Sequence, residues 1–168
     1  MHKKAAGEKM ISFHVPDDKD LLSALGSLTL RHEHMNHILK MTIRSLADLT
    51  PEEAFHALKR ESTSSLRQRI NKLAKKVLGE GKPLLRLQSL LGRAGDLSKK
   101  RNGYVHGIWA IELDGDALIL DLPEKISPSP TVEQLEKLGL EIEALTNELN
   151  TARLDGWLKE AIISKGKV

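Results

Sequence analysis

The chain has 168 residues, of which 40% are hydrophobic, 29% charged and 3% aromatic, and its formal net charge is +3. These values are typical of a globular protein with an aliphatic core, and the length favours a single domain. The absence of cysteine excludes a disulfide framework, a thiolate metal site and a cysteine nucleophile. No apolar run has the length of a membrane span and no signal peptide is recognisable, so we expect a cytoplasmic protein without a membrane partner.

The charge is distributed unevenly along the chain. Residues 59–101 carry 13 basic and 3 acidic side chains, a net charge of +10, whereas the segments before and after them are net acidic. Such a block is the electrostatic pattern of a surface that binds a polyanion. The alternative is a solvated helix face, which charge runs form more often than binding sites.

The first part of the chain combines an irregular segment with a long amphipathic one. Residues 1–15 show no clear periodicity and are predicted to form a loosely ordered leader, followed by a single helical domain over residues 16–168. From residue 21 to residue 49, apolar side chains, mostly leucine, recur at alternating steps of three and four. This spacing predicts a long helix whose apolar stripe is suited to a bundle.

Three further helices are predicted in the segment that follows. A Thr-Pro-Glu-Glu sequence at 50–53 has the form of a capping box with proline in the first turn, which predicts a short helix over 51–59. After a polar turn, an apolar stripe over 66–77 predicts the next helix. A proline and a leucine stripe predict another helix over 83–101.

The pattern changes after residue 107. Alternating apolar residues on both sides of an Asp-Gly turn predict a small β-hairpin over 108–122, and the Ser-Pro-rich residues 126–130 are predicted to be a linker. A second capping box introduces a last helix from about 132 to 152, with an extension to 163 that is interrupted at Gly156. The predicted fold class is therefore all-α, an antiparallel helical bundle with a small β-hairpin insertion.

The residues most suited to chemistry stand at the end of the fourth predicted helix. Arg101, Asn102 and His106 follow Lys99 and Lys100 there. Arginine binds phosphate through a planar fork of donors, histidine transfers protons near neutral pH, and asparagine orients a neighbouring side chain or hydroxyl. These residue types are what a metal-free cleavage of a phosphodiester requires, and the two lysines are predicted to contact nucleic acid.

Helical geometry relates the motif side chains to one another. Asn102 and His106 are four residues apart and share a face, whereas Arg101 continues the inward apolar stripe. A guanidinium on that stripe needs a carboxylate, a second copy of the helix or a phosphate as its partner. Gly103 is unfavourable inside a helix and suits the close approach of another backbone, such as the same helix of a second subunit.

This segment resembles the motif of the HEPN family, in which an arginine, often followed by asparagine, precedes a histidine after a short gap. Arg101, Asn102 and His106 match these positions, and Gly107 and Trp109 look like the HG-W ending of one bacterial branch. The resemblance implies a helical bundle that forms homodimers, with two motifs facing one cleft. It also implies a metal-independent endoribonuclease, in which His106 acts as general base or acid, Arg101 stabilises transition-state charge and Asn102 orients the site.

The resemblance leaves more than one function open, because other HEPN members bind RNA or proteins without cleaving. The chain is predicted to be an endoribonuclease or an RNA-binding protein that needs no cofactor. The alternative is a catalytically inactive homodimer that serves as an interaction or structural module, in which Arg101, Asn102 and His106 form only a polar network. Besides a second copy and RNA, an antitoxin or another protein is a candidate partner.

Other polar residues are assigned supporting or competing roles. Glu33 and Tyr104 are predicted to support the motif, Glu33 by pairing with the motif arginine if the two helices pack side by side. Glu33, His34 and His37 have spacings suited to metal ligands, but no other residue completes a ligand set, and no metal site is predicted. His32 lies in the apolar stripe and is predicted to be a hydrogen-bonded core histidine.

Overall fold

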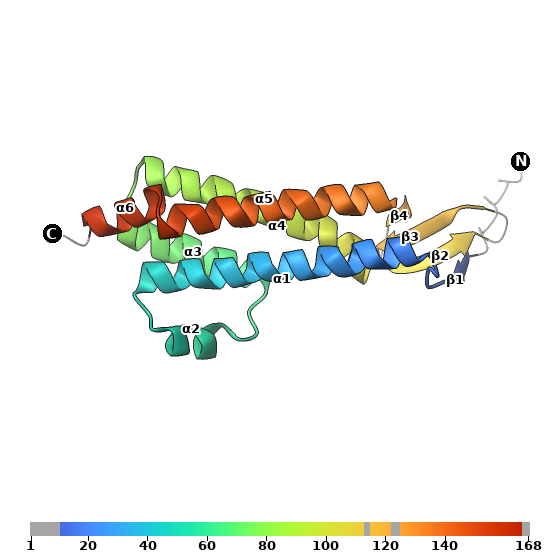
Figure 1. The fold of residues 1–168 in the computed structure, drawn as a ribbon, viewed down its shortest axis with the longest axis horizontal. Coiled ribbons are helices and arrows are strands. Elements are labelled where there is room, and N and C mark those ends of the chain that lie inside the picture. The colour runs from blue at the N-terminus through green and yellow to red at the C-terminus, as the bar shows by residue number, and fades with distance from the viewer. Residues whose placement is uncertain (1–10, 113–114, 122–124, 166–168) are drawn as a thin grey trace, which may run out of the picture.

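The computed structural model describes residues 11–112, 115–121 and 125–165, which form an elongated helical bundle with a small sheet at one end (Figure 1). The long helices run along the length of the molecule, and the last helix lies at the end opposite the sheet. In chain order the elements are β1 (Ile11–Phe13), α1 (Lys19–Ala47), α2 (Pro51–Leu58), α3 (Thr63–Leu78), α4 (Lys82–His106), β2 (Ile108–Glu112), β3 (Ala117–Asp121), β4 (Lys125–Pro128), α5 (Val132–Leu154) and α6 (Trp157–Lys165).

Capping side chains mark the helix starts. Asp18 caps α1 and Ser62 caps α3, each by accepting a hydrogen bond from an amide of the first turn. The capping boxes predicted at the starts of α2 and α5 are both formed. The predicted interruption of the last helix separates α5 from α6 at Gly156. The predicted helices are therefore confirmed, with bounds that differ by a few residues.

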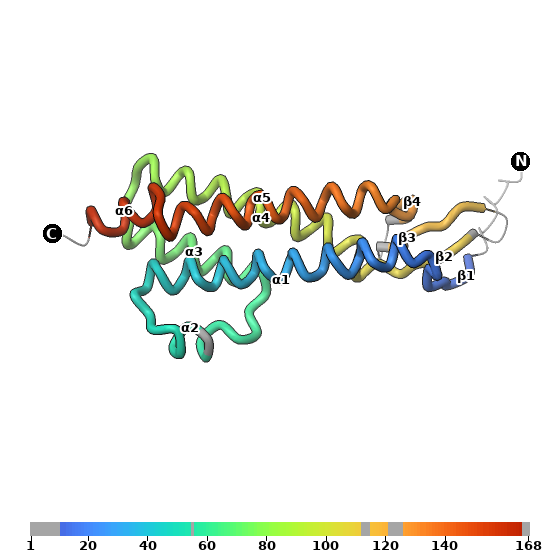
Figure 2. The backbone as a smooth tube through the Cα atoms, viewed as in Figure 1, coloured from blue at the N-terminus to red at the C-terminus, as the bar shows by residue number. Residues whose placement is uncertain are grey.

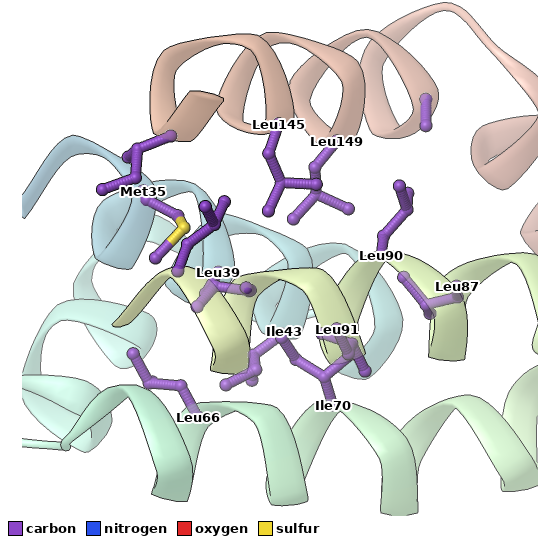
Figure 3. Close-up of a cluster of buried hydrophobic side chains, with 14 of the residues drawn as sticks. Met35, Leu39, Ile43, Leu66, Ile70, Leu87, Leu90, Leu91, Leu145 and Leu149 are labelled. Carbon is purple, nitrogen blue, oxygen red and sulfur yellow. The ribbon is translucent and has the colours of Figure 1, made fainter. Parts of the chain in front are cut away.

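Leucine forms most of the core, along the stripes that the sequence predicts (Figure 3). α1 is central, in contact with α3, α4 and α5, and its Leu28, Leu39 and Ile43 are fully buried. Burying each such side chain stabilises the fold by about 1.5–3 kcal/mol. α2 contacts α1 and stands beside the bundle between two connecting segments (Figure 2). Within the described residues, no helix combines the length and hydrophobicity needed to cross a bilayer.

The predicted hairpin is present as part of a larger sheet. β2 and β3 pair antiparallel, with Trp109 opposite Ile119. β1 pairs with the other edge of β2, and β4 pairs with the other edge of β3. The result is a four-stranded antiparallel sheet in the order β1-β2-β3-β4.

The two outer strands correct two sequence predictions. Residues 11–13, predicted to belong to the leader, form β1, and residues 126–128, predicted to belong to a linker, lie in β4. Both are edge strands of three or four residues, too short to show the alternation from which a strand is predicted. Pro128 has no amide hydrogen, which is tolerated in an edge strand. Residues 1–10 of the predicted leader lie outside the described residues.

Gly107 joins the end of α4 to the sheet, and this junction sets the position of His106. α4 ends at His106, and Gly107 has the extended conformation, with φ −65° and ψ 149°. A methyl group on Gly107 would collide with Cγ2 of Ile119 on β3 and with the carbonyl oxygen of Gly103. The absence of a side chain at Gly107 therefore lets β3 pack against the last turn of α4.

We predict that Gly107→Ala destabilises the protein by about 1–3 kcal/mol, the usual cost of adding a methyl group to a packed site. Gly26→Ala is the matched control, because the Cβ that it adds on α1 has no described atom within 4 Å apart from its chain neighbours and the adjoining helix backbone. That substitution should raise the free energy of unfolding by roughly 0.5–1 kcal/mol, because alanine is a better helix former than glycine. Urea denaturation followed by circular dichroism measures both, and wild-type stability in Gly107→Ala would contradict the packing argument.

Candidate functional site

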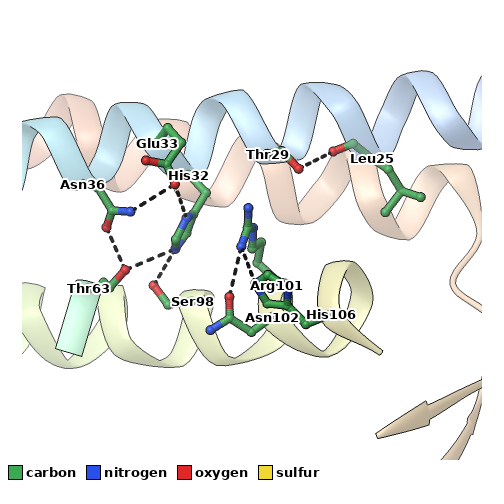
Figure 4. Close-up of polar contacts among 10 residues, drawn as sticks. All are labelled: Leu25, Thr29, His32, Glu33, Asn36, Thr63, Ser98, Arg101, Asn102 and His106. Carbon is green, nitrogen blue, oxygen red and sulfur yellow. Dashed lines mark hydrogen bonds and ion pairs between the residues drawn. The ribbon is translucent and has the colours of Figure 1, made fainter. Parts of the chain in front are cut away.

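The three motif side chains gather at the end of α4 (Figure 4). Arg101 Nη1 lies 3.2 Å from Asn102 Oδ1 and 3.2 Å from His106 Nε2. Because a guanidinium only donates hydrogen bonds, Nε2 of His106 accepts in this contact, and the proton of the neutral ring is on Nδ1. The lone pair of His106 that could act as a base is therefore held by Arg101 in this arrangement.

Arg101 is a buried cation without a direct counter-ion. Only 7% of the residue is exposed, and its Nε makes no hydrogen bond. In the described part of the chain, no carboxylate lies within 4.0 Å of its guanidinium. Burial lowers the pKa of Arg101, and the negative charge of Glu33 partly opposes this. A desolvated charge is costly unless an anion offsets it, so the position is suited to an anionic ligand.

A hydrogen-bonded network joins α1, α3 and α4 next to Arg101 (Figure 4). His32 on α1 is 3% exposed, and its Nε2 lies 3.0 Å from Ser98 Oγ and 3.4 Å from Thr63 Oγ1. Thr63 Oγ1 donates to Asn36 Oδ1 at 2.7 Å. The prediction that His32 is a hydrogen-bonded core histidine is confirmed. The network holds the start of α3 and the last turns of α4 against α1.

Glu33 contacts this network and not Arg101. Its Oε1 accepts a hydrogen bond from Asn36 Nδ2 at 3.4 Å and lies 3.6 Å from His32 Nδ1. The direct ion pair with Arg101 that the sequence predicts is not formed, because the carboxylate is directed to its neighbours on α1. Glu33 still favours the charged form of Arg101 through the longer-range interaction of the two charges.

The neighbouring histidines of α1 are not joined by ligands from another element. His34 and His37 are exposed. Among the described residues, no group of three or more His, Asp or Glu side chains is arranged to hold a metal ion.

A cleft of about 770 Å³ opens over the motif, and the basic side chains in its lining outnumber the acidic ones. Two carboxylates line it, those of Glu33 and Glu61, and Glu61 is bound by Arg69 at 2.7 Å. The lysines and arginines that line it are Lys40, Lys59, Arg60, Arg67, Lys99 and Arg101. All but Lys40 belong to the basic block at residues 59–101, so part of that block faces the motif across the cleft.

Two of the predicted site residues lie outside this cleft. Lys100 and Tyr104 line a second cavity of about 580 Å³, next to β3 and the start of α5. Lys99 and Gly103 line both cavities, so the two meet along this part of α4. The Tyr104 carbonyl accepts a hydrogen bond from Trp109 Nε1 at 3.1 Å. Tyr104 therefore supports the end of α4 through its main chain, which is tied to β2.

Sequence reasoning does not identify Asn36, Thr63 and Ser98 as members of the site. Asn36 follows a core methionine and lies four residues after His32, and Ser98 follows a core leucine. A polar residue at the edge of a buried stripe is a usable signal, because buried polar groups need partners. Thr63 lies 27 residues from its partner Asn36, and Ser98 lies 66 residues from its partner His32. Helical periodicity does not reveal contacts between residues so far apart in the sequence.

No protein-family model, curated protein or solved structure matches the chain. Function is therefore inferred from the residues of the cleft and from their geometry.

We predict that His32 makes stability depend on pH. Burial, and then the charge of Arg101, lower the pKa of His32 below its ordinary value of 6.5, Glu33 partly opposes them, and His106 adds to the lowering. At pH values between the ordinary pKa and the lowered one, His32 binds a proton in the unfolded chain but not in the folded chain. The stability present above about pH 6.5 is therefore lost as the pH falls through the lowered pKa.

The measurement compares urea midpoints of wild type and His32→Gln between about pH 7 and about pH 5, the interval in which an ordinary histidine titrates. Glutamine is neutral and retains a hydrogen-bonding group near Ser98, and the remaining histidines are the same in both proteins. The midpoint of the wild type should fall more steeply as the pH decreases. Equal slopes would show that His32 titrates alike in the folded and unfolded chains.

Proposed function

We propose that this protein is a HEPN-like endoribonuclease that binds RNA in the basic cleft and cleaves it without a metal ion. The observation that carries the proposal is the state of Arg101, a buried guanidinium that lines the cleft, contacts His106 and meets no carboxylate of the described residues within 4.0 Å. An RNA phosphate offers the two-oxygen anion that a guanidinium binds best. The other lysines and arginines of the cleft would attract the rest of the RNA backbone.

The contact between Arg101 and His106 links phosphate binding to proton transfer. When Arg101 turns to a phosphate, Nε2 of His106 loses its hydrogen bond, and its lone pair becomes available to the ribose 2′-hydroxyl. His106 takes the proton from that hydroxyl, and the 2′-oxygen forms a bond to phosphorus. The bond from phosphorus to the 5′-oxygen breaks, and the leaving oxygen takes a proton from water. The products are a 2′,3′-cyclic phosphate and a 5′-hydroxyl.

The remaining motif residues stabilise and orient this step. Arg101 offsets the negative charge that develops on the phosphorane-like transition state. Asn102 is exposed beside the cleft, and its amide contacts the guanidinium at 3.2 Å, which leaves its Nδ2 to orient the substrate. Each role uses an atom that already lines the cleft.

The alternative function is a non-enzymatic module that pairs with a second copy or binds a protein such as an antitoxin. It is favoured by the contacts that Arg101 makes with Asn102 and His106 in the absence of any ligand, since these contacts could serve only to fix the end of α4. The two functions differ in what Arg101→Met does to stability. Removing an uncompensated charge kept for a ligand stabilises the fold, whereas removing a structural contact destabilises it.

We predict that the purified protein cleaves mixed RNA in the presence of EDTA and leaves DNA intact, because the attacking group is the 2′-hydroxyl. His106→Ala should reduce the cleavage rate by about 10²–10⁴-fold and leave RNA binding largely unchanged, because it removes only proton transfer. Gel analysis of end-labelled RNA measures cleavage, and fluorescence anisotropy measures binding. Both should weaken as salt rises.

Arg101→Met is the variant that separates the two functions. The proposal predicts weaker binding and cleavage with a melting temperature equal to or above that of the wild type. Arg93→Met is the matched control, because Arg93 is an exposed arginine of α4 that pairs with Glu148 and does not line the cleft. Wild-type protein that neither binds nor cuts RNA, together with a lowered melting temperature in Arg101→Met, would establish the structural alternative.

We also infer that two copies of the chain pair around Gly103. Apart from its chain neighbours and the adjoining backbone of α4, no atom of the described residues lies within 4 Å of a Cβ built on Gly103, and Asn102 and His106 beside it are exposed. The last turns of α4 thus offer a surface that a second helix can approach closely at Gly103. Two such helices meeting at a two-fold axis would bring two copies of Arg101 and His106 into one cleft.

One chain has a mass of 18.7 kDa, and we expect light scattering at micromolar concentration to report twice that mass. Gly103→Leu should give monomers with an unchanged helical signal, because the open space at Gly103 admits a side chain within the same chain but not between two copies. Gly26→Leu is the control, since Gly26 is equally open on α1 and far from the motif in sequence. A monomeric wild type would exclude a composite site and leave catalysis to one copy of the motif.

A further inference from the structure

The first turn of α3 faces the same cleft as Arg101. Ser62 caps this helix by accepting a hydrogen bond from the amide of Ser65 at 3.2 Å. The amides of Thr63 and Ser64 have no acceptor within the helix, as in every first helical turn. Ser62, Thr63 and Ser64 all line the cleft, and the first turn contains no acidic residue to offset the positive end of the helix dipole.

Two arginines that line the cleft adjoin this turn. Arg60 lies just before α3, and Arg67 lies on its second turn. Arg67 Nε donates to the carbonyl of Leu91 at 2.6 Å, and its guanidinium packs over Gly95 so closely that a Cβ there would collide with it. Because Gly95 has no side chain, the guanidinium of Arg67 can lie against α4 at the wall of the cleft.

The nearest carboxylate in the sequence, that of Glu61, is already engaged. Arg69 Nη1 donates to Glu61 Oε1 at 2.7 Å, and Ser65 Oγ donates to Glu61 Oε2 at 2.8 Å. Because Arg69 pairs with it, Glu61 reduces the positive potential at this turn less than an unpaired carboxylate would.

A series of contacts connects the start of α3 to the part of α4 that carries Arg101. Thr63 Oγ1 lies 3.4 Å from His32 Nε2, which lies 3.0 Å from Ser98 Oγ, and Ser98 is one helical turn before Arg101. Arg101 is more than nine-tenths buried, and its Nε is without a hydrogen bond. Its Nη1 contacts Asn102 and His106, but no carboxylate of the described residues lies within 4.0 Å of the guanidinium. This buried charge without a contacting anion is an observation independent of the helix start, and it indicates that the shared cleft receives an anion.

We propose that the first turn of α3 is a second phosphate subsite, which holds the phosphate adjacent to the one bound at Arg101. The free amides of Thr63 and Ser64 donate to its oxygens, and Arg60 and Arg67 offset its charge. This inference rests on the proposed RNA-binding function. It specifies the ligand as a strand with two consecutive phosphodiesters, and so predicts that the cleft favours an oligonucleotide over a dinucleotide.

The test combines two changes: one amide hydrogen is removed from the protein, and one phosphate charge is removed from the ligand. Ser64→Pro removes the amide of Ser64, and Pro83 occupies the equivalent second position of α4, so this chain already accommodates proline there. Ser64→Ala is the control that removes the hydroxyl and keeps the amide. The ligands are a 2′-O-methylated trinucleotide, which cannot be cleaved, and the same trinucleotide with an uncharged methylphosphonate at either its 5′ or its 3′ linkage.

Affinities are measured by competition with a fluorescein-labelled RNA in fluorescence anisotropy. Wild type and Ser64→Ala should bind the fully charged trinucleotide about tenfold more tightly than one of the two methylphosphonate ligands, as for the loss of a hydrogen bond to a charged group. In Ser64→Pro this preference should become clearly smaller, because the amide of Thr63 and the charges of Arg60 and Arg67 remain, and the affinity for that methylphosphonate ligand should be unchanged. Circular dichroism verifies that the variant is folded.

The outcomes distinguish failure of this subsite from failure of the proposed function. Binding that depends on Arg101 but shows the same charge preference in wild type and Ser64→Pro overturns the subsite and leaves RNA binding standing. No binding of any trinucleotide by the wild type overturns both. If Ser64→Pro fails to fold, the double variant Arg60→Gln, Arg67→Gln replaces it, with Lys75→Gln, Lys76→Gln as the control on the exposed far end of α3.

Discussion

The charge of Arg101 on the inward face of α4 is the constraint on which the site depends. Leucines precede it on the same stripe, so the helix packing that forms the core also draws the guanidinium out of water. Its compensation is partial, because Asn102 and His106 accept hydrogen bonds while the charge of Glu33 acts only from farther away. A carboxylate in contact would have satisfied the cation and closed the position to an external anion.

A polar layer inside a leucine bundle is stable only when its groups find partners, and here they come from three helices. His32 contacts Ser98 on α4 and Thr63 on α3, and Thr63 in turn binds Asn36 on α1. Burial and the charge of Arg101 lower the pKa of His32, so the network favours a neutral ring. A neutral His32 adds no second positive charge beside Arg101, and it leaves the start of α3 fixed beside the motif.

The shape of the cleft follows from how closely the backbones approach one another. Gly95 admits the guanidinium of Arg67 against α4, and Gly107 admits β3 against the end of the same helix. Between these two points lies the motif, and the segment that follows α2 contributes residues 59–62 to the lining of the cleft. Glycine therefore has a packing role at both ends of the site, whereas a side chain at Gly103 between them would meet no described atom beyond its chain neighbours and the adjoining backbone of α4.

The sequence by itself determined the features that depend on neighbours along the chain. Helix positions, the capping boxes and the β2–β3 hairpin follow from periodicity and turn residues. The contact of Arg101 with His106 does not follow in this way, because residues five apart differ by about 140° around a helix, and only the structure shows it. Tertiary structure alone decided which distant groups meet. It added β1 to β2 across about a hundred residues, placed Lys100 and Tyr104 outside the main cleft, and joined His32 to Ser98. Periodicity states which face of a helix is buried, but not which residue of another helix lies against it, because that depends on how all the helices pack together.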